Sequence, residues 1–119
     1  MREPCIFWSP SNIKPAVVTE LGTTMDLFTT FSALAGVPMP KDRVMDGFDL
    51  GSTLFRNAPS PRKGVFYYRG TQLYAARLGD YKAHYITQGS YGQFGQKEVH
   101  DTPILYNLSV DPSENFDIG

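Results

Sequence analysis

One segment of the chain, residues 23–36, carries apolar residues at helical spacing. Thr23 is a helix-capping residue type, and Asp26 stands three positions later, which resembles a capping box. Gly36 and the following Pro38 favour termination of the helix. The apolar positions that would share one face are Leu27, Phe28, Phe31, Leu34 and Ala35. The pattern predicts an amphipathic helix whose apolar face lies in a core.

From residue 64 onward the pattern changes to the short β-branched and aromatic runs of strands. Strands are expected at residues 64–69, 72–78, 81–87 and 104–108. Gly79 and Asp80 separate the second run from the third and favour a tight hairpin. Residues 88–97, rich in glycine and glutamine, are expected to form a flexible loop. These runs predict an antiparallel sheet of about four strands.

The remaining apolar positions lie before and after the predicted helix. Cys5–Trp8 is a continuous apolar run between two prolines, which is typical of a strand buried on both faces, and Cys5 would then be a buried small side chain. Residues 42–55 contain the turn dipeptide Asp46-Gly47 and are expected to cover the helix as a loop with one short turn. The element order predicts an α+β chain.

Composition narrows the possible functions. The net charge of −1, with scattered lysines and arginines, gives no basic surface for nucleic acid or for an anionic membrane. No window approaches the ~18 apolar residues of a membrane span, and the first ten residues lack the apolar length of a signal peptide. The sequence contains no P-loop, dinucleotide fingerprint or nucleophile elbow. It therefore shows no complete catalytic apparatus, and no catalytic residue is predicted.

The third predicted strand contains the first candidate site residues. Strand alternation places Lys82 and His84 on one face together with Ile86. A lysine beside a histidine could bind an anion such as sulfate or phosphate and would lower the pKa of the imidazole. The alternative is a solvated strand face with an exposed lysine. The residues alone leave both interpretations open.

Two further positions carry candidate chemistry. His100 follows the predicted loop and precedes the last predicted strand, a common place for a site residue. Its alternative role is a loop histidine bonded to Asp101 or to backbone. Two distant histidines without close spacing predict no metal site. Asn107 begins an Asn-Leu-Ser triplet and is a candidate glycosylation site.

A set of segments along the chain also resembles a known family. The segments are "REPCIFWSP", "ELGTTMDLFTTFSALAGVPMP", "MDGFDL", "FYYRG", "LGDYKAHYITQGS" and "PILYNLSVDPSENF". In this order and at these spacings they resemble the C-terminal part of arylsulfatases, from Arg2 to about Phe116. No single segment decides the resemblance; the ordered set is specific.

The resemblance implies a fold and a division of the chain. Residues 1–60 would supply the last strand and helix of an alkaline-phosphatase-like α/β sulfatase domain, with a cover loop. Residues 61–119 would form a small C-terminal antiparallel subdomain whose loops help to wall the substrate pocket. Lys82 and His84 match the family's "KAH" positions, and His100 matches a histidine before its last strand. The resemblance implies that these three are pocket-wall or structural residues.

The family's chemistry implies that this chain is one part of a larger enzyme. Sulfatases cleave sulfate esters with a formylglycine made from the cysteine of a C-x-P-S-R motif, beside a calcium ion. Cys5 stands in "EPCIF" and does not match that motif. The calcium ligands and catalytic residues of the family would lie upstream, in a missing N-terminal sulfatase domain. The chain alone is therefore expected to be inactive.

The resemblance also implies a setting for the protein. The expected substrate is a sulfated sugar or glycosaminoglycan, the expected location is lysosomal or secreted, and a homodimer is possible. The alternative from another class is a stand-alone, non-enzymatic carbohydrate-binding or interaction module. A phosphodiesterase of the same superfamily would need two-metal ligands that this stretch lacks.

Overall fold

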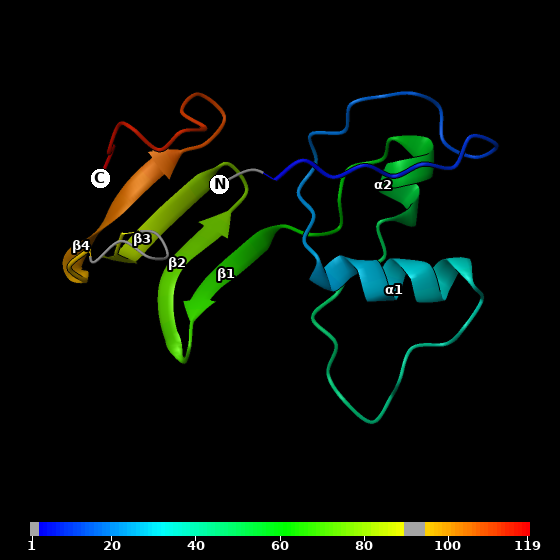
Figure 1. The fold of residues 1–119 in the computed structure, drawn as a ribbon, viewed down its shortest axis with the longest axis horizontal. Helices are drawn as coiled ribbons and strands as arrows, with labels where there is room; N and C mark the ends of the chain where they lie inside the picture. Colours follow the sequence, from blue (N-terminus) through cyan, green and yellow to red (C-terminus); the bar gives the residue numbers. More distant parts are fainter. Residues whose placement is uncertain (1–2, 90–94) are drawn as a thin grey trace. The chain divides into compact units, whose positions relative to one another are not determined.

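The computed structural model of the chain describes residues 3–89 and 95–119. The chain divides into two compact units, one formed by Pro4–Lys63 and the other containing Gly64–Gly119. The first unit holds the helices α1 and α2, and the second holds a four-stranded sheet (Figure 1). Each unit is described in its own right.

The sheet consists of four consecutive antiparallel strands in the order β1-β2-β3-β4. Their bounds are Gly64–Arg69 for β1, Gln72–Leu78 for β2, Tyr81–Thr87 for β3 and Glu98–Asn107 for β4. The first three coincide with the strands predicted from sequence. Two-residue turns join the first three strands, and Gly70 and Gly79 adopt the positive φ that such turns require. The predicted loop at residues 88–97 lies partly outside the described residues.

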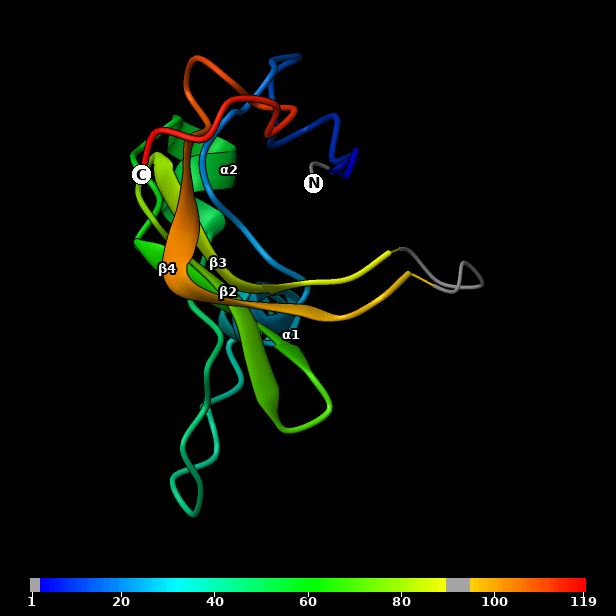
Figure 2. The same ribbon diagram turned by 90° about the vertical axis from the view of Figure 1, so that its left-hand side faces the viewer.

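The fourth strand is longer than predicted, because it begins at Glu98 and not at Ile104. Its pairing with β3 is irregular, because His84 pairs with Ile104 and Ile86 pairs with Val99. More residues of β4 than of β3 therefore lie between these two pairs. Pro103 falls in this irregular stretch, and proline is tolerated here because β4 is an edge strand. Figure 2 shows that β4 bends strongly along its length. Because proline is typical of strand ends, the sequence pattern did not predict the part of β4 that precedes Pro103.

One face of the sheet carries the core of this unit. Its buried apolar residues are Val65, Ala75, Ile86 and Leu108. The opposite face leaves Phe66, Leu78 and Tyr81 exposed, as strand alternation requires. The core face also includes Lys82, whose exposed fraction is only 6%. A charged side chain therefore lies among the apolar residues of the core.

The helical unit contains α1 (Met25–Leu34) and the short α2 (Gly51–Arg56). The predicted capping relation is present in part: the backbone N–H and the hydroxyl of Thr23 both donate to Asp26 Oδ2, at 2.7 and 3.1 Å. Gly36 has a φ of 69° just beyond the C-cap, as expected for a helix stop. The short turn predicted in the cover segment is α2.

The buried face of α1 is polar, which differs from the prediction. Phe28, Phe31 and Leu34 are about half exposed, whereas Asp26 and Thr30 are buried. The buried side of the helix faces the segment around Phe48. Asp26 Oδ1 accepts a hydrogen bond from the N–H of Phe48 at 2.8 Å, and Thr30 Oγ1 accepts one from the N–H of Leu50 at 2.9 Å. Backbone groups of an irregular segment need polar partners, and α1 supplies them.

Asp26 also forms a buried ion pair with Arg62. Arg62 donates to both of its carboxylate oxygens, at 2.8 and 2.6 Å, and the exposed fractions of the two side chains are 5% and 0%. The same guanidinium donates to the carbonyl of Asp46 and lies over the ring of Phe48. Arg62, near the end of the unit, is therefore bonded both to α1 and to the cover segment.

The predicted strand at residues 5–8 is wrong for this structure. Cys5–Trp8 has no strand pairing, and Cys5, Ile6 and Trp8 are exposed. A strand requires a neighbour for its backbone groups, and the four strands that the structure describes pair only with one another. The expectation that Cys5 is buried is wrong for the same reason.

Candidate functional site

The core face of the sheet brings Lys82 and His84 together. In the register, Lys82 lies between Arg77 of β2 and Tyr106 of β4, and His84 lies between Ala75 and Ile104. The two side chains project from the same side of β3, as the alternation predicted. The alternative of an exposed lysine on a solvated face is wrong, because Lys82 is buried.

Both side chains reach the same carboxylate, that of Glu114. Lys82 Nζ lies 2.7 Å from Glu114 Oε1, and His84 Nε2 lies 2.6 Å from Glu114 Oε2. The exposed fraction of the Glu114 side chain is 15%. Two residues of a central strand thus hold one residue of the C-terminal segment; we call these three residues the Glu114 cluster.

Aromatic rings enclose the Glu114 cluster. The ammonium of Lys82 lies 4.9 Å from the ring centroid of Tyr67, which is within range of a cation–π interaction. The imidazole of His84 meets the ring of Tyr106 edge-on, with the centroids 5.6 Å apart. The rings come from β1 and β4, so that strands on both sides of β3 contribute to the enclosure.

The electrostatics of the Glu114 cluster fix its protonation state. Burial raises the pKa of Glu114, but hydrogen bonds to the carboxylate, among them those from Lys82 and His84, outweigh it and lower the pKa to about 2. Burial lowers the pKa of His84 below 6.5; the hydrogen bond to Glu114 opposes this shift and the charge of Lys82 reinforces it. At neutral pH the cluster is an ammonium, a carboxylate and a neutral imidazole whose Nε2–H donates to Glu114.

The Glu114 cluster fastens the C-terminal segment to the sheet. Glu114 has a φ of 58°, an uncommon conformation for a residue with a side chain. Asp111 stabilises the same turn by accepting from the N–H groups of Asn115 and Phe116, at 2.7 and 2.8 Å. Asp117 then accepts from the N–H of Leu105 at 2.9 Å, on the edge strand. The segment is therefore held to both β3 and β4.

His100 and Asn107 lie elsewhere on the sheet. His100 belongs to β4, which contradicts the alternative of a loop histidine, and its Nε2 lies 2.8 Å from Thr87 Oγ1 of the neighbouring strand β3. Asn107 ends β4, and its Oδ1 accepts from the N–H and hydroxyl of Ser109 at 3.0 and 2.6 Å. The sequon of Asn107 thus forms a local turn.

Sequence reasoning missed the carboxylates that organise both units. The sequence pattern placed Asp26 only at a helix cap and gave Glu114 no role. Their cationic partners are 32 and 36 residues away in the sequence. A pairing over such a distance leaves no local pattern; the only available sign was a lysine at a core position of β3.

The described residues do not fit the family's metal or its nucleophile. Among residues 3–89 and 95–119, no group of three or more histidine, cysteine or acidic side chains could hold a metal ion. Cys5, in the sequence Glu-Pro-Cys-Ile-Phe, lacks the proline, serine and arginine that follow the modified cysteine in sulfatases. Within the same ranges, no helix has the length and apolar character that crossing a membrane requires.

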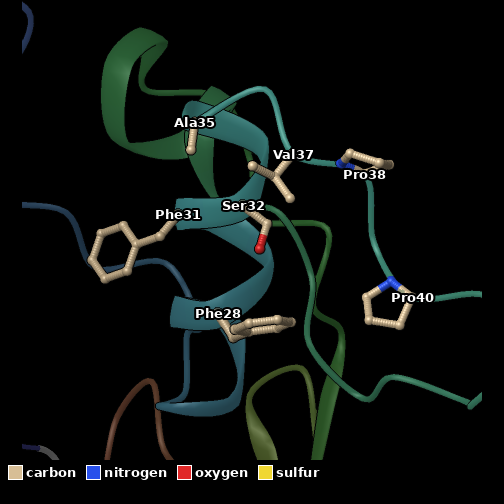
Figure 3. Close-up of a pocket in the computed structure, with 7 residues that line it drawn as sticks. All are labelled: Phe28, Phe31, Ser32, Ala35, Val37, Pro38 and Pro40. Carbon is tan, nitrogen blue, oxygen red and sulfur yellow. The ribbon is translucent and has the colours of Figure 1, made fainter.

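A second surface feature is an apolar groove beside α1 (Figure 3). Phe28 and Phe31 project from the helix, and Val37, Pro38 and Pro40 follow in the segment after it. Ser32 contributes the one hydroxyl of the lining. The groove contains no titratable side chain, so it offers a contact surface and no reactive chemistry.

Comparison with known proteins identifies the class of protein. Residues 60–119 match the family described as the C-terminal region of aryl-sulfatase. Human arylsulfatase A is 38% identical over 99% of this chain and 26% of its own length. Mouse N-acetylgalactosamine-6-sulfatase is 40% identical over 100% of this chain and 26% of its own length. The chain belongs to the sulfatases and corresponds to their C-terminal region, as the resemblance indicated.

Solved structures agree with this assignment. A sulfatase from Pseudoalteromonas has a TM-score of 0.66 and 27% identity, covering 79% of this chain and 21% of its own. A structure from work on glycosaminoglycan metabolism by Bacteroides thetaiotaomicron has a TM-score of 0.70 and 26% identity, covering 92% of this chain and 23% of its own. The chain thus spans about a quarter of the length of these relatives.

Proposed function

We propose that this chain is the C-terminal part of an enzyme that hydrolyses sulfate esters of sugars or glycosaminoglycans. The observation that carries the proposal is the match of the whole chain, at 38–40% identity, to arylsulfatase A and N-acetylgalactosamine-6-sulfatase. The names of these relatives supply the reaction and the substrate class. The lysosomal or secreted location and the calcium and formylglycine of the complete enzyme are proposed on the same basis.

In this proposal the Glu114 cluster supports the substrate pocket and performs no chemistry. The ammonium of Lys82 is compensated by Glu114 inside the sheet, and the neutral imidazole of His84 donates its Nε2–H to the same carboxylate. A compensated lysine and a neutral histidine suit residues that support the side of the substrate pocket. His100, which contacts Thr87, is proposed as a further wall residue, and Asn107 as a glycosylation site.

The experiment that tests the proposal compares two proteins for hydrolysis of an aryl sulfate ester. One is this chain alone, and the other is the chain joined to an upstream sulfatase domain that carries the C-x-P-S-R motif. The joined protein is expected to release sulfate in a calcium-dependent reaction, and the chain alone to release none. Hydrolysis by the chain alone would contradict the assignment of the nucleophile to the upstream domain.

A variant of His84 tests the role given to the Glu114 cluster. In the joined protein, His84→Ala is expected to raise KM or to reduce the yield of folded protein while turnover remains detectable. A well-folded His84→Ala protein without any turnover would show that the imidazole takes part in the reaction. Asp42→Ala is a matched control, because the Asp42 carboxylate is exposed and pairs with its sequence neighbour Arg43.

A further inference from the structure

A second polar cluster lies at the end of the sheet where β1 and β3 finish and where β2 and β4 begin. Its centre is Tyr74 of β2, and two cations lie near the ring. The guanidinium carbon of Arg69 is 5.7 Å from the ring centroid, and the ammonium of Lys97 is 6.0 Å from it. Both distances fall within the range of cation–π interactions. We call this group the Tyr74 cluster.

Two glutamines complete the Tyr74 cluster. Gln88 Oε1 accepts from Arg69 Nη1 at 2.8 Å and from the hydroxyl of Tyr74 at 2.9 Å. Gln72 Oε1 accepts from Lys97 Nζ at 2.5 Å. Four strands or strand ends contribute to it.

A β-bulge sets the position of the Tyr74 ring. Tyr67 pairs with Ala75 and the adjacent Tyr68 pairs with Leu73, so Tyr74 is the extra residue of β2. A bulge redirects the side chain of the extra residue and interrupts the regular ladder. Figure 2 shows that the β1–β2 hairpin diverges from the β3–β4 pair at this end of the sheet. The ring of Tyr74 contacts residues of both hairpins, because Arg69 ends β1 whereas Gln88 follows β3 and Lys97 precedes β4.

The Tyr74 cluster differs from the Glu114 cluster in its charge balance. Within the part of the chain that the structure describes, Lys97 has Gln72 and the ring of Tyr74 as partners and no carboxylate. Lys97 and both glutamines are exposed, whereas Lys82 is buried and paired with Glu114. A partly exposed group of cations around an aromatic ring suits an anionic ligand that has an apolar face.

We propose that the Tyr74 cluster is a binding site for a sulfated saccharide. The ring of Tyr74 would contact the C–H face of a sugar, and Arg69 and Lys97 would hold its sulfate group. This proposal rests on the proposed function, because the substrate class supplies the saccharide. It adds a second contact region, distinct from the Glu114 cluster, that binds sugar and takes no part in hydrolysis.

The test is an NMR titration of the full chain with a hexasaccharide of glucuronate and N-acetylgalactosamine-6-sulfate. A chemically desulfated hexasaccharide, which keeps the carboxylates, is the matched ligand. We expect shifts of the backbone amides of Gln72 and Tyr74 with the sulfated compound, and binding at least about threefold weaker with the desulfated one. Equal binding of the two compounds, or shifts confined to other residues, would overturn the proposal.

Variants locate the contact. Lys97→Gln is expected to weaken binding of the sulfated compound at least about threefold. Tyr74→Leu removes the ring and should weaken both compounds, whereas Tyr74→Phe should retain most of the binding. Lys41→Gln, at an exposed lysine of the helical unit, is the control and should leave binding unchanged. Equal affinities of the Lys97 and Lys41 variants would contradict the site.

Failure of this proposal is distinguishable from failure of the proposed function. Binding is measured without turnover, and hydrolysis of the aryl sulfate is measured without a saccharide. An active joined enzyme whose chain binds both hexasaccharides equally would refute the Tyr74 site alone. A sulfate-selective chain whose joined form lacks hydrolysis would refute the enzyme assignment and retain the binding site.

Discussion

The two units of the chain each contain a buried ion pair, but the surroundings of the pairs differ. Around Asp26 and Arg62 the buried residues are mainly polar; they are Thr30, Thr53 and Ser60, with Leu50 the buried apolar residue. Around Lys82 and Glu114 the sheet adds a backbone ladder of four strands and an apolar core. Ionic and hydrogen-bonded contacts therefore dominate the interior of the first unit and supplement that of the second.

The difference has an energetic consequence. Removing one member of a buried pair leaves an uncompensated charge, which costs more than the pair contributes. The cost rises as water access falls, and the exposed fractions are 5% and 0% for Arg62 and Asp26 but 8% and 15% for Lys82 and Glu114. The helical unit should therefore respond to such a change more strongly than the sheet.

The largest expected effect is that of Asp26→Ala. The substitution removes the carboxylate that compensates the charge of Arg62. It also removes the acceptors of the N–H groups of Thr23 and Phe48. We expect the free energy of unfolding to fall by about 3–5 kcal/mol, measured by urea denaturation followed by circular dichroism. The double variant Asp26→Leu/Arg62→Met removes both charges and should cost less than Asp26→Ala. A double variant that is less stable than the single one would contradict the expectation that the uncompensated charge of Arg62 causes the loss.

The second effect is that of Glu114→Gln in the sheet unit. The neutral amide cannot compensate Lys82, but the strand ladder remains, so we expect a loss of about 2 kcal/mol. Hydrogen exchange should accelerate at Ile118, whose N–H donates to the carbonyl of Leu105, because the C-terminal segment loosens. Glu98→Gln, at an exposed position of β4, is the control. Unchanged exchange at Ile118 would contradict the role of Glu114 as a fastener.

Acid should destabilise the sheet unit in two steps. His84 has a lowered pKa when folded, so the unfolded chain takes up a proton first and stability falls as the pH drops through 6.5. Glu114 has a lowered pKa, so its contribution is complete above 4.5 and is lost as the pH falls towards about 2. Denaturation midpoints measured from pH 8 to 2 should show both steps. Glu114→Gln should remove the lower step, and a profile identical to wild type would contradict this assignment.

Local patterns predicted most of the fold, and distant pairings account for what they missed. Alternation and turn residues located β1, β2 and β3, and helical spacing located α1 within two residues. They did not show that the buried face of α1 is the one with Asp26 and Thr30, since partners of these side chains are 18 to 36 residues away. The start of β4 was hidden by Pro103, which is tolerated at an edge but reads as a strand breaker.

The sequence predicted two of the three residues of the Glu114 cluster. Alternation alone placed Lys82 and His84 on one face, because a period of two is a local property. It could not identify Glu114, which comes from an irregular turn with a positive φ. The Tyr74 cluster depends on a bulge and on side chains from several strand ends, neither of which has a sequence pattern.

The smallest expected effect is that of replacing a glycine with a positive φ. For this change the two units should behave alike. Gly36 of the helical unit and Gly79 of the sheet have φ values of 69° and 57°, and an added Cβ would meet no atom within 4 Å at either position. Substitution by alanine then costs only the left-handed conformation, roughly 1 kcal/mol at each position. Gly79→Asn should cost less, since asparagine tolerates this conformation. Urea denaturation of the variants measures the costs. Equal costs for Gly36→Ala and Gly79→Ala would show that the units differ in their interiors and not in their turns, whereas a much larger cost in the helical unit would mean that its turns also depend on the Asp26–Arg62 pair.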